Sequence, residues 1–312
     1  PPGAADEAPD GLWSGSDAAP WSAHGPRQPR SSVARHGAGS RSAGPRLQIL
    51  GMFDSGTHLL GALLEANVGH ETMRDICPNA DIGAENTWKE DYHCHFWKHE
   101  TPQQLDRLVG VFKRQEAAFG ARRSLVVVAM VRSPLAQLAG WAKAPYDLQE
   151  CVNRVGLYNT DSPGSLKPSA PCSMRGDSFA GLTGVWNEYV RAYDNLSRRA
   201  DDGVRTIVVE YERLVLDPEP VVRQIAGALG LRLDTFRSIE SDAKKDGESH
   251  GRDEAIQSIE NMLYQRDFNP GGSLGGWGSK GAVCRSLDQD LLRRHDFVLR
   301  SGSRRAYIAD CE

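Results

Sequence analysis

The chain has 312 residues, of which 25% are charged and 39% apolar, and its formal net charge is −4 at pH 7. This composition is ordinary for a globular protein and argues against a dedicated nucleic-acid-binding protein, which is usually strongly basic. No apolar run approaches the roughly 18–20 residues of a transmembrane helix. The sequence begins with Pro1 rather than Met, which leaves room for a signal or membrane anchor upstream.

Residues 1–45 are predicted to be a disordered leader or stem. They are rich in Pro, Gly, Ala, Ser and Arg and hold few large aliphatic residues, so they cannot bury a hydrophobic core. Residues 46–312 are expected to form the folded domain.

From residue 46 onward, short apolar runs alternate with segments of helical periodicity. The predicted elements are, in order, a strand at 47–50, a helix at 57–67, a strand at 92–99, a helix at 101–119, a strand at 124–131, a helix at 134–144, a loop at 156–177, a helix at 179–199, a segment at 205–214 that opens as a strand, and a helix at 218–231. The Gly-rich stretch from 267 predicts a long loop. Alternating strands and helices indicate βαβ units, so the expected fold class is α/β, with a central parallel sheet flanked by helices on both faces.

The first predicted strand leads through Gly51 into a compact turn at the start of a helix. Gly51 and Gly56 are spaced as in the phosphate loop G-x-x-x-x-G-K-[ST], but Thr57 and His58 stand where Lys and Ser/Thr belong. Backbone N–H groups at a helix N-terminus can bind an anion without a side-chain cation. An ordinary strand-to-helix turn is the alternative interpretation.

Two further candidates lie at predicted strand ends, where open parallel sheets bind ligands. Arg132 directly follows the strand at 124–131, and a guanidinium there is well placed for bidentate bonds to a phosphate; the alternative is an ordinary surface Arg. Lys98 and His99 close the strand at 92–99. His99 is suited to take a proton near neutral pH, and Lys98 to neutralise charge on a leaving phosphate.

The six cysteines include no CxxC pair and no zinc-finger spacing. They fit either disulfides in an oxidising compartment or scattered reduced thiols. Cys151 and Cys172 flank a Pro-, Ser- and Gly-rich stretch and are the first candidates for a disulfide. His93 and His95 alternate on a predicted strand without an evident third ligand, so no metal site is predicted.

Taken in order, these segments resemble the sulfotransferase family that uses 3′-phosphoadenosine 5′-phosphosulfate (PAPS). The family's 5′-phosphosulfate loop is similar to "DSGTHLL", its K-x-H-x-P segment to "KHETP" with the His shifted by one position, its 3′-phosphate motif to "VVVAMVRSPLAQLAGW", and a later segment to "VEYERLVLDPEPVVRQIAGALGL". The match runs from about residue 47 to 231, with a vaguer echo to 285. The resemblance implies a P-loop NTPase-like α/β fold and in-line transfer of a sulfuryl group from PAPS to a hydroxyl or amine, with no metal required.

The resemblance also assigns roles to individual residues, namely Ser55, Gly56, Thr57 and His58 to the 5′-phosphosulfate, Arg132 to the 3′-phosphate, Tyr211 to the adenine, and His99 to deprotonation of the acceptor. Residues 46–312 would then be the catalytic domain.

Two departures from the family pattern stand out. Asp54 replaces the loop Lys or Arg that steadies the leaving group, and Gly140 replaces a Ser that helps to bind the 3′-phosphate. Because a phosphosulfate would repel an anionic Asp54 at close range, we expect this carboxylate to face away from the ligand, as a helix cap or paired with a cation. We hypothesise that Lys98 supplies the missing positive charge.

The predicted function is therefore sulfuryl transfer from PAPS to a small-molecule or carbohydrate acceptor. The first alternative is a catalytically inactive homologue that binds nucleotide or glycan. A nucleotide kinase or NTPase is disfavoured, because GK[ST] is missing and the strand at 124–131 ends in Arg rather than Asp. The leader, the candidate disulfide and a sequon at Asn195 slightly favour the Golgi lumen and a glycan acceptor over the cytoplasm and a small metabolite.

Overall fold

The structure is a computed structural model, and it describes residues 45–68, 97–118, 124–157, 171–199, 203–239, 241–243, 249–251, 253–257, 259 and 280–295. These residues belong to one structural unit, Arg41–Glu312. The predicted leader at 1–45 lies outside the described residues, apart from its last residue.

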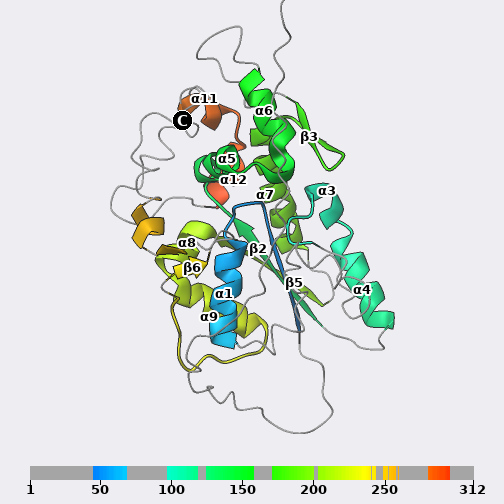
Figure 1. The fold of residues 1–312 in the computed structure, drawn as a ribbon. Helices are drawn as coiled ribbons and strands as arrows, with labels where there is room; N and C mark the ends of the chain where they lie inside the picture. The colour runs from blue at the N-terminus through cyan, green and yellow to red at the C-terminus, as the bar shows by residue number, and fades with distance from the viewer. Residues whose placement is uncertain are drawn as a thin grey trace, which may run out of the picture. The chain divides into compact units, whose positions relative to one another are not determined.

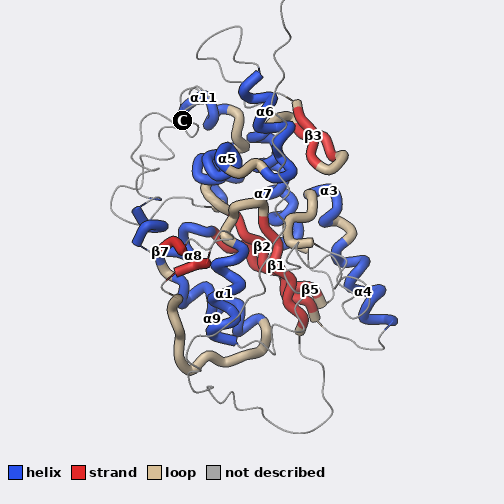
Figure 2. The backbone as a smooth tube through the Cα atoms, viewed as in Figure 1, coloured by secondary structure: helices blue, strands red, loops and turns tan. Residues whose placement is uncertain are grey.

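A parallel sheet of three strands forms the centre of the described fold (Figures 1 and 2). Its order is β1 (Arg46–Gly51), β2 (Leu125–Val131) and β5 (Val204–Glu210), and both neighbouring pairs are parallel. β2 is the middle strand and is buried along its whole length, as expected for an uninterrupted apolar run in a parallel sheet. Since the strands are parallel, their carboxyl ends meet at one edge of the sheet.

Helices cover both faces of this sheet. The odd-numbered residues of β2 belong to one buried cluster, together with residues of α5 (Pro134–Lys143) and α7 (Leu182–Arg198). The even-numbered residues of β2 belong to a second cluster, together with residues of α1 (Thr57–Val68) and α9 (Pro218–Ala228). This alternation follows from the two-residue period of a strand, and the predicted mixed α/β architecture is confirmed to this extent.

The other elements lie around this core (Figure 1). They are α3 (Pro102–Leu105), α4 (Leu108–Ala118), η1 (Tyr146–Leu148), α6 (Gln149–Leu157), β3 (Cys172–Met174), β4 (Asp177–Phe179), α8 (Tyr211–Leu216), β6 (Ser241–Ala243), β7 (Ser249–Gly251), α11 (Lys280–Arg285) and α12 (Gln289–Arg294). β3 pairs with β4 and β6 with β7, both antiparallel. None of the helices described is long and apolar enough to cross a membrane.

Two predicted elements differ from the structure. The strand at 92–99 is wrong at its end, since Lys98 and His99 lie in a turn; residues 92–96 lie outside the described residues. The helix at 101–119 is divided into α3 and α4, because a tighter turn, with Arg107 N donating to Gln104 O at 3.0 Å, interrupts it. Leu105 and Leu108, on either side of this turn, are both buried.

The segment predicted as a loop at 156–177 also holds unpredicted structure. Its first residues end α6, residues 158–170 lie outside the described residues, and the hairpin of β3 and β4 follows. Arg175 and Gly176 form the hairpin turn with φ of 52° and 87°. Positive φ at both central residues suits a tight hairpin.

A disulfide joins Cys151 of α6 to Cys172 of β3, with the two Cα atoms 4.9 Å apart. This confirms the pairing predicted first from the sequence. Cys284 in α11 is disulfide-bonded as well. Every cysteine in the described part of the chain is therefore oxidised.

Candidate functional site

The turn between β1 and α1, residues 52–56, contains two residues with a left-handed backbone. Asp54 and Gly56 have φ of 60° and 88°, and Ser55 N donates to Met52 O at 3.2 Å. A Cβ at Gly56 would overlap the ring of Tyr211, so the chain needs glycine here for two reasons. The N–H groups of the first turn of α1 have no helical acceptor.

Three side chains hold the outer side of this loop. Gln137 Nε2 and Trp141 Nε1 of α5 both donate to Phe53 O, the latter at 3.0 Å. Arg132 Nη1 donates to Asp54 O at 2.9 Å. The loop carbonyls are thus fixed by the protein itself, which preorganises the loop without a ligand.

Ser55 lies inside the loop with its side chain fully buried. Its Oγ lies against Gly51, where an added Cβ would overlap it, and no described group forms a hydrogen bond with it. An unpaired buried hydroxyl costs about 1–3 kcal/mol, and a ligand oxygen in the loop would remove that cost. The loop therefore contains a second feature, besides the helix N-terminus, that points to a bound anion.

Arg132 follows β2 directly and joins the loop to Tyr211. Its guanidinium lies over the Tyr211 ring, 4.7 Å from the centroid. Its Nε is buried without a hydrogen-bond partner among the described groups, so donor capacity remains at this end of the sheet. Tyr211 is the first residue of α8, directly after β5.

Glu212, next to Tyr211, is a buried carboxyl group at the same edge. Burial raises its pKa, while Arg132 and the N–H of Ser133 act in the opposite direction. Ser133 N donates to Glu212 Oε1 at 3.0 Å. Glu212 thus fixes the chain immediately after Arg132, and sequence reasoning missed this positioning contact.

Lys98 and His99 lie beside the end of β1. Gly51 N donates to Lys98 O at 2.8 Å, and His99 Nδ1 donates to Gly51 O at 2.7 Å. Lys98 is only 5% exposed, and its Nζ donates to Nε2 of His58 at 3.1 Å. A buried cation from a second segment therefore contacts the side chain of His58 in α1.

His99 is buried and stacked on Phe53, with ring centroids 4.6 Å apart. Its pKa is lowered to about 3, first by burial and then by the positive charge of Lys98. The ring is therefore neutral near pH 7. Since Nδ1 carries the proton given to Gly51 O, Nε2 is the nitrogen with a lone pair.

A cluster of aromatic side chains packs beside His99. Tyr146 stacks on Phe53 at 5.0 Å with nearly parallel rings, and it is the one large hydrophobic side chain exposed in the described regions, at 46%. Trp97 lies edge-on to Phe53 and to His99. Arg175, from the disulfide-anchored hairpin, covers the Trp97 ring at 3.9 Å.

The side chain of Asp54 lies next to helix α5. Its carboxylate lies against Gly140 of α5, where an added Cβ would be 3.3 Å from Asp54 Oδ2.

The structure thus brings all the predicted site residues to one edge of the sheet. Ser55, Gly56, Thr57 and His58 line the loop and first turn, and the others surround it. Gln137, Trp141 and Glu212 were not predicted, because Gln137 and Trp141 read as ordinary positions on a buried helix and Glu212 as part of a strand end. Within the described regions, no group of three or more His, Cys, Asp or Glu side chains is arranged to hold a metal ion; His93 and His95 lie outside these regions.

Comparison of the chain with models of known protein families and with curated proteins found no match.

Proposed function

We propose that this protein is a sulfotransferase that moves a sulfuryl group from PAPS to a hydroxyl or amine of an acceptor, on a P-loop NTPase-like α/β fold. The observation that carries the proposal is the convergence of the four motif segments. The loop, Arg132 and Tyr211 follow three adjacent parallel strands, and Lys98–His99 hydrogen-bonds to the end of the first strand. The resemblance rests only on the motifs and their order along the sequence, so their proximity in the structure supports the proposal independently.

The donor would be held by backbone and side chains together. Ser55, Gly56, Thr57 and His58 would bind the 5′-phosphosulfate, with the buried Ser55 hydroxyl as one donor. Arg132 would bind the 3′-phosphate through donors that it retains. Tyr211, stacked under the guanidinium, would approach the adenine.

Lys98 would supply the charge that the loop itself lacks. Its ammonium group lies 3.1 Å from Nε2 of His58, one of the residues proposed to bind the 5′-phosphosulfate. In a buried position such a cation stabilises developing negative charge strongly.

His99 would accept the proton of the acceptor through Nε2. In the proposed step, the acceptor oxygen or nitrogen forms a bond to sulfur, the bond from sulfur to the 5′-phosphate oxygen breaks with its electron pair remaining on the phosphate, and the acceptor proton passes to His99. The low pKa of free His99 makes it a weak base. A bound phosphosulfate would raise the proton affinity of His99 by opposing the charge of Lys98.

The acceptor would lie on the aromatic side of His99. The exposed Tyr146 ring beside Phe53 suits a sugar or phenol ring better than a highly charged acceptor. The oxidised state of every cysteine described favours a lumenal compartment such as the Golgi.

A transfer assay tests the proposal. PAPS labelled in the sulfuryl group is incubated with the protein and a panel of sugars, phenols and alkaloid-like amines, in the presence of a chelator. Transfer that resists the chelator is the expected result, since no step requires a metal.

The alternative is an inactive homologue, which Asp54 in place of the loop cation favours. Titration calorimetry with PAPS separates the two, because binding without transfer to any acceptor supports the inactive form. Absence of both binding and transfer would overturn both proposals, and ATP turnover with magnesium would point to an NTPase.

A further inference from the structure

Glu212 is a buried carboxyl group at the candidate site that the proposed transfer does not use. Only 6% of the residue is exposed. Its Oε1 accepts from Ser133 N at 3.0 Å, while its Oε2 is buried without a hydrogen-bond partner among the described groups. Buried carboxylates are normally paired or fully hydrogen-bonded. Hydrogen bonds therefore satisfy the negative charge of Glu212 only in part, beside the chain segment that carries Arg132.

The charged form of Glu212 depends on Arg132. Burial is the largest influence on the pKa of Glu212 and raises it. The positive charge of Arg132 comes second and lowers this pKa, and the N–H groups of Glu212 itself and of Ser133 act in the same direction. The negative charge of Glu210, at the end of β5, raises the pKa, and Glu210 Oε1 itself lies 3.8 Å from His295 Nδ1. Anything that neutralises Arg132 therefore shifts Glu212 toward its protonated form.

A phosphate bound to Arg132 would have this effect. It carries between one and two negative charges near neutral pH, which oppose the positive charge that favours the carboxylate. Protonation would not remove the contact with the backbone, because a protonated carboxyl group keeps an acceptor oxygen for Ser133 N. A neutral Glu212 would also leave the charge of the guanidinium to the phosphate.

We propose that Glu212 is a positioning residue of the nucleotide site, which holds the chain after Arg132 and takes up a proton when a phosphate binds there. This inference rests on the proposed function, in that Arg132 is taken to bind the 3′-phosphate of the donor. Binding of the donor is then coupled to proton uptake, and its affinity falls as the pH rises through the titration of Glu212.

Three variants separate this role from a merely structural one. Glu212→Gln keeps an oxygen that can accept from Ser133 N and is neutral at every pH, so it mimics the protonated form. Glu212→Ala removes both the charge and the contact. The matched control is Glu188→Gln in α7, because the pKa of Glu188 is also raised by burial and its carboxylate accepts from Gln103 Nε2 at 3.1 Å, outside the candidate site.

Titration calorimetry on the whole chain, with adenosine 3′,5′-bisphosphate as the probe, measures the affinities between pH 5.5 and 8.5. Wild type and Glu212→Gln should bind equally at pH 5.5, and wild type should bind about tenfold more weakly at pH 8.5, which corresponds to a rise of about one unit in the pKa of Glu212 on binding. The titration of the nucleotide acts on both proteins alike and cancels in the ratio of their affinities. Glu188→Gln should follow the wild type at every pH, and Glu212→Ala should bind more weakly than Glu212→Gln throughout.

Titrations in two buffers of different ionisation enthalpy count the protons directly. Wild type should take up more protons than Glu212→Gln, by as much as one per nucleotide. If the bisphosphate binds but the affinity ratio and the proton count are the same in the two proteins at every pH, the inference is overturned while the proposed function stands. If Glu212→Gln does not fold, the absence of net proton uptake by wild type at every pH overturns the inference. If wild type does not bind the bisphosphate, the proposed function falls, and the inference with it.

Discussion

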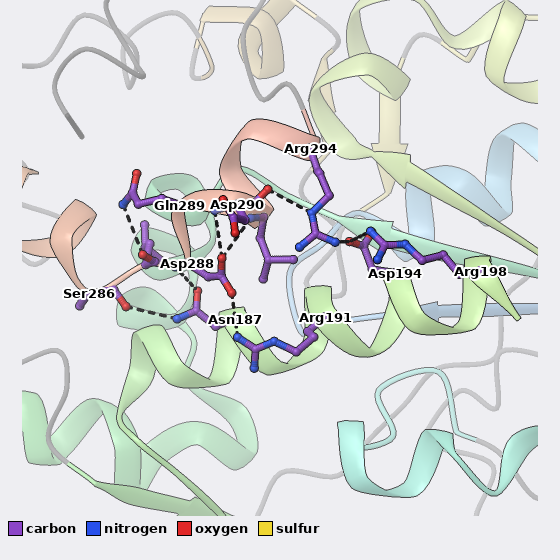
Figure 3. Close-up of polar contacts among 11 residues, drawn as sticks. Asn187, Arg191, Asp194, Arg198, Ser286, Asp288, Gln289, Asp290 and Arg294 are labelled. Atoms are coloured by element: carbon purple, nitrogen blue, oxygen red, sulfur yellow. Dashed lines mark hydrogen bonds and ion pairs between the residues drawn. The ribbon is translucent and has the colours of Figure 1, made fainter.

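Two polar regions of this molecule differ in how the hydrogen-bonding capacity of their polar groups is satisfied. At the junction of α7 and α12, polar side chains pair with one another: Arg191 with Asp288 at 2.8 Å, Arg294 with Asp194 at 2.7 Å, and Asn187 with the chain at Ser286 and Asp288 (Figure 3). At the candidate site, Ser55 Oγ, Arg132 Nε and Glu212 Oε2 are buried with no hydrogen-bond partner among the described groups.

The difference separates a structural region from a functional one. Charges that complete each other's hydrogen bonds need nothing from outside, so the junction serves to hold α12 on α7. Buried polar groups left without hydrogen-bond partners are costly in a folded protein and indicate a place where a ligand completes their hydrogen bonds. The contrast is one of degree, since the buried Tyr193 hydroxyl in α7 also lacks a partner in the described part of the chain.

The largest effect is expected at the candidate site, where Lys98 is replaced. Replacing Lys98 with Ala should lower the rate of sulfuryl transfer by about 100-fold or more, because loss of one charge that stabilises a transition state costs that much. Binding of adenosine 3′,5′-bisphosphate should remain measurable by calorimetry. Lys113→Ala, which removes an exposed lysine on α4, is the control and should leave the rate unchanged; near-normal turnover in Lys98→Ala would sink the hypothesis.

A second test makes the same substitution in both regions. Arg132→Ala should weaken the bisphosphate roughly 100-fold, since it removes charge-assisted hydrogen bonds. Arg294→Ala should leave that affinity unchanged and lower the melting temperature by about 2–4 °C, because its ion pair with Asp194 is partly exposed. Calorimetry and thermal unfolding measure both effects, and equal loss of affinity in the two variants would remove the distinction between the regions.

The third test uses the buried, neutral His99. Its folded pKa of about 3 lies below its usual value of 6.5, so it contributes stability above pH 6.5 that is lost as the pH falls toward 3. Between pH 6.5 and 5 the wild type should lose about 2 kcal/mol more unfolding free energy than His99→Gln, which cannot titrate. Urea unfolding across this range measures the slopes; the slopes should agree above pH 7, and identical slopes below pH 6.5 would contradict the burial argument.

The sequence predicted the core of the fold well because that part depends on local patterns. The apolar β-branched run at 125–131 and the caps and periodicity of the flanking helices fix strands and helices over short stretches. The rule that parallel strands present ligands at their carboxyl ends then placed the loop and Arg132 together. Lys98 and His99 were expected at this edge, but they lie in a turn bonded to β1 rather than at the end of a strand.

Other features depend on contacts that no local pattern encodes. Gln137 and Trp141 are spaced as neighbours on one helix face, and only the fold reveals that this face meets the carbonyl of Phe53. The contact of Asp54 with Gly140 joins two elements through packing, so each departure looked like an independent loss. α11 and α12 follow a Gly-rich stretch and are short, so they lacked a periodic signal.

The smallest effect is expected at the α7–α12 junction, where the free energy of unfolding changes. Asp288 is the N-cap of α12, and its Oδ1 accepts from the N–H groups of Asp290 and Leu291. Asp288→Ala should therefore destabilise the protein by about 1 kcal/mol, measured by urea unfolding, and leave bisphosphate affinity unaltered. Asp288→Asn keeps a capping oxygen and loses only the ion pair with Arg191, which is half-exposed, so it should cost less than Asp288→Ala. A change in nucleotide affinity in either variant would mean that the α7–α12 junction is coupled to the candidate site. The paired side chains of the junction would then help to position the buried polar groups of the site that lack hydrogen-bond partners.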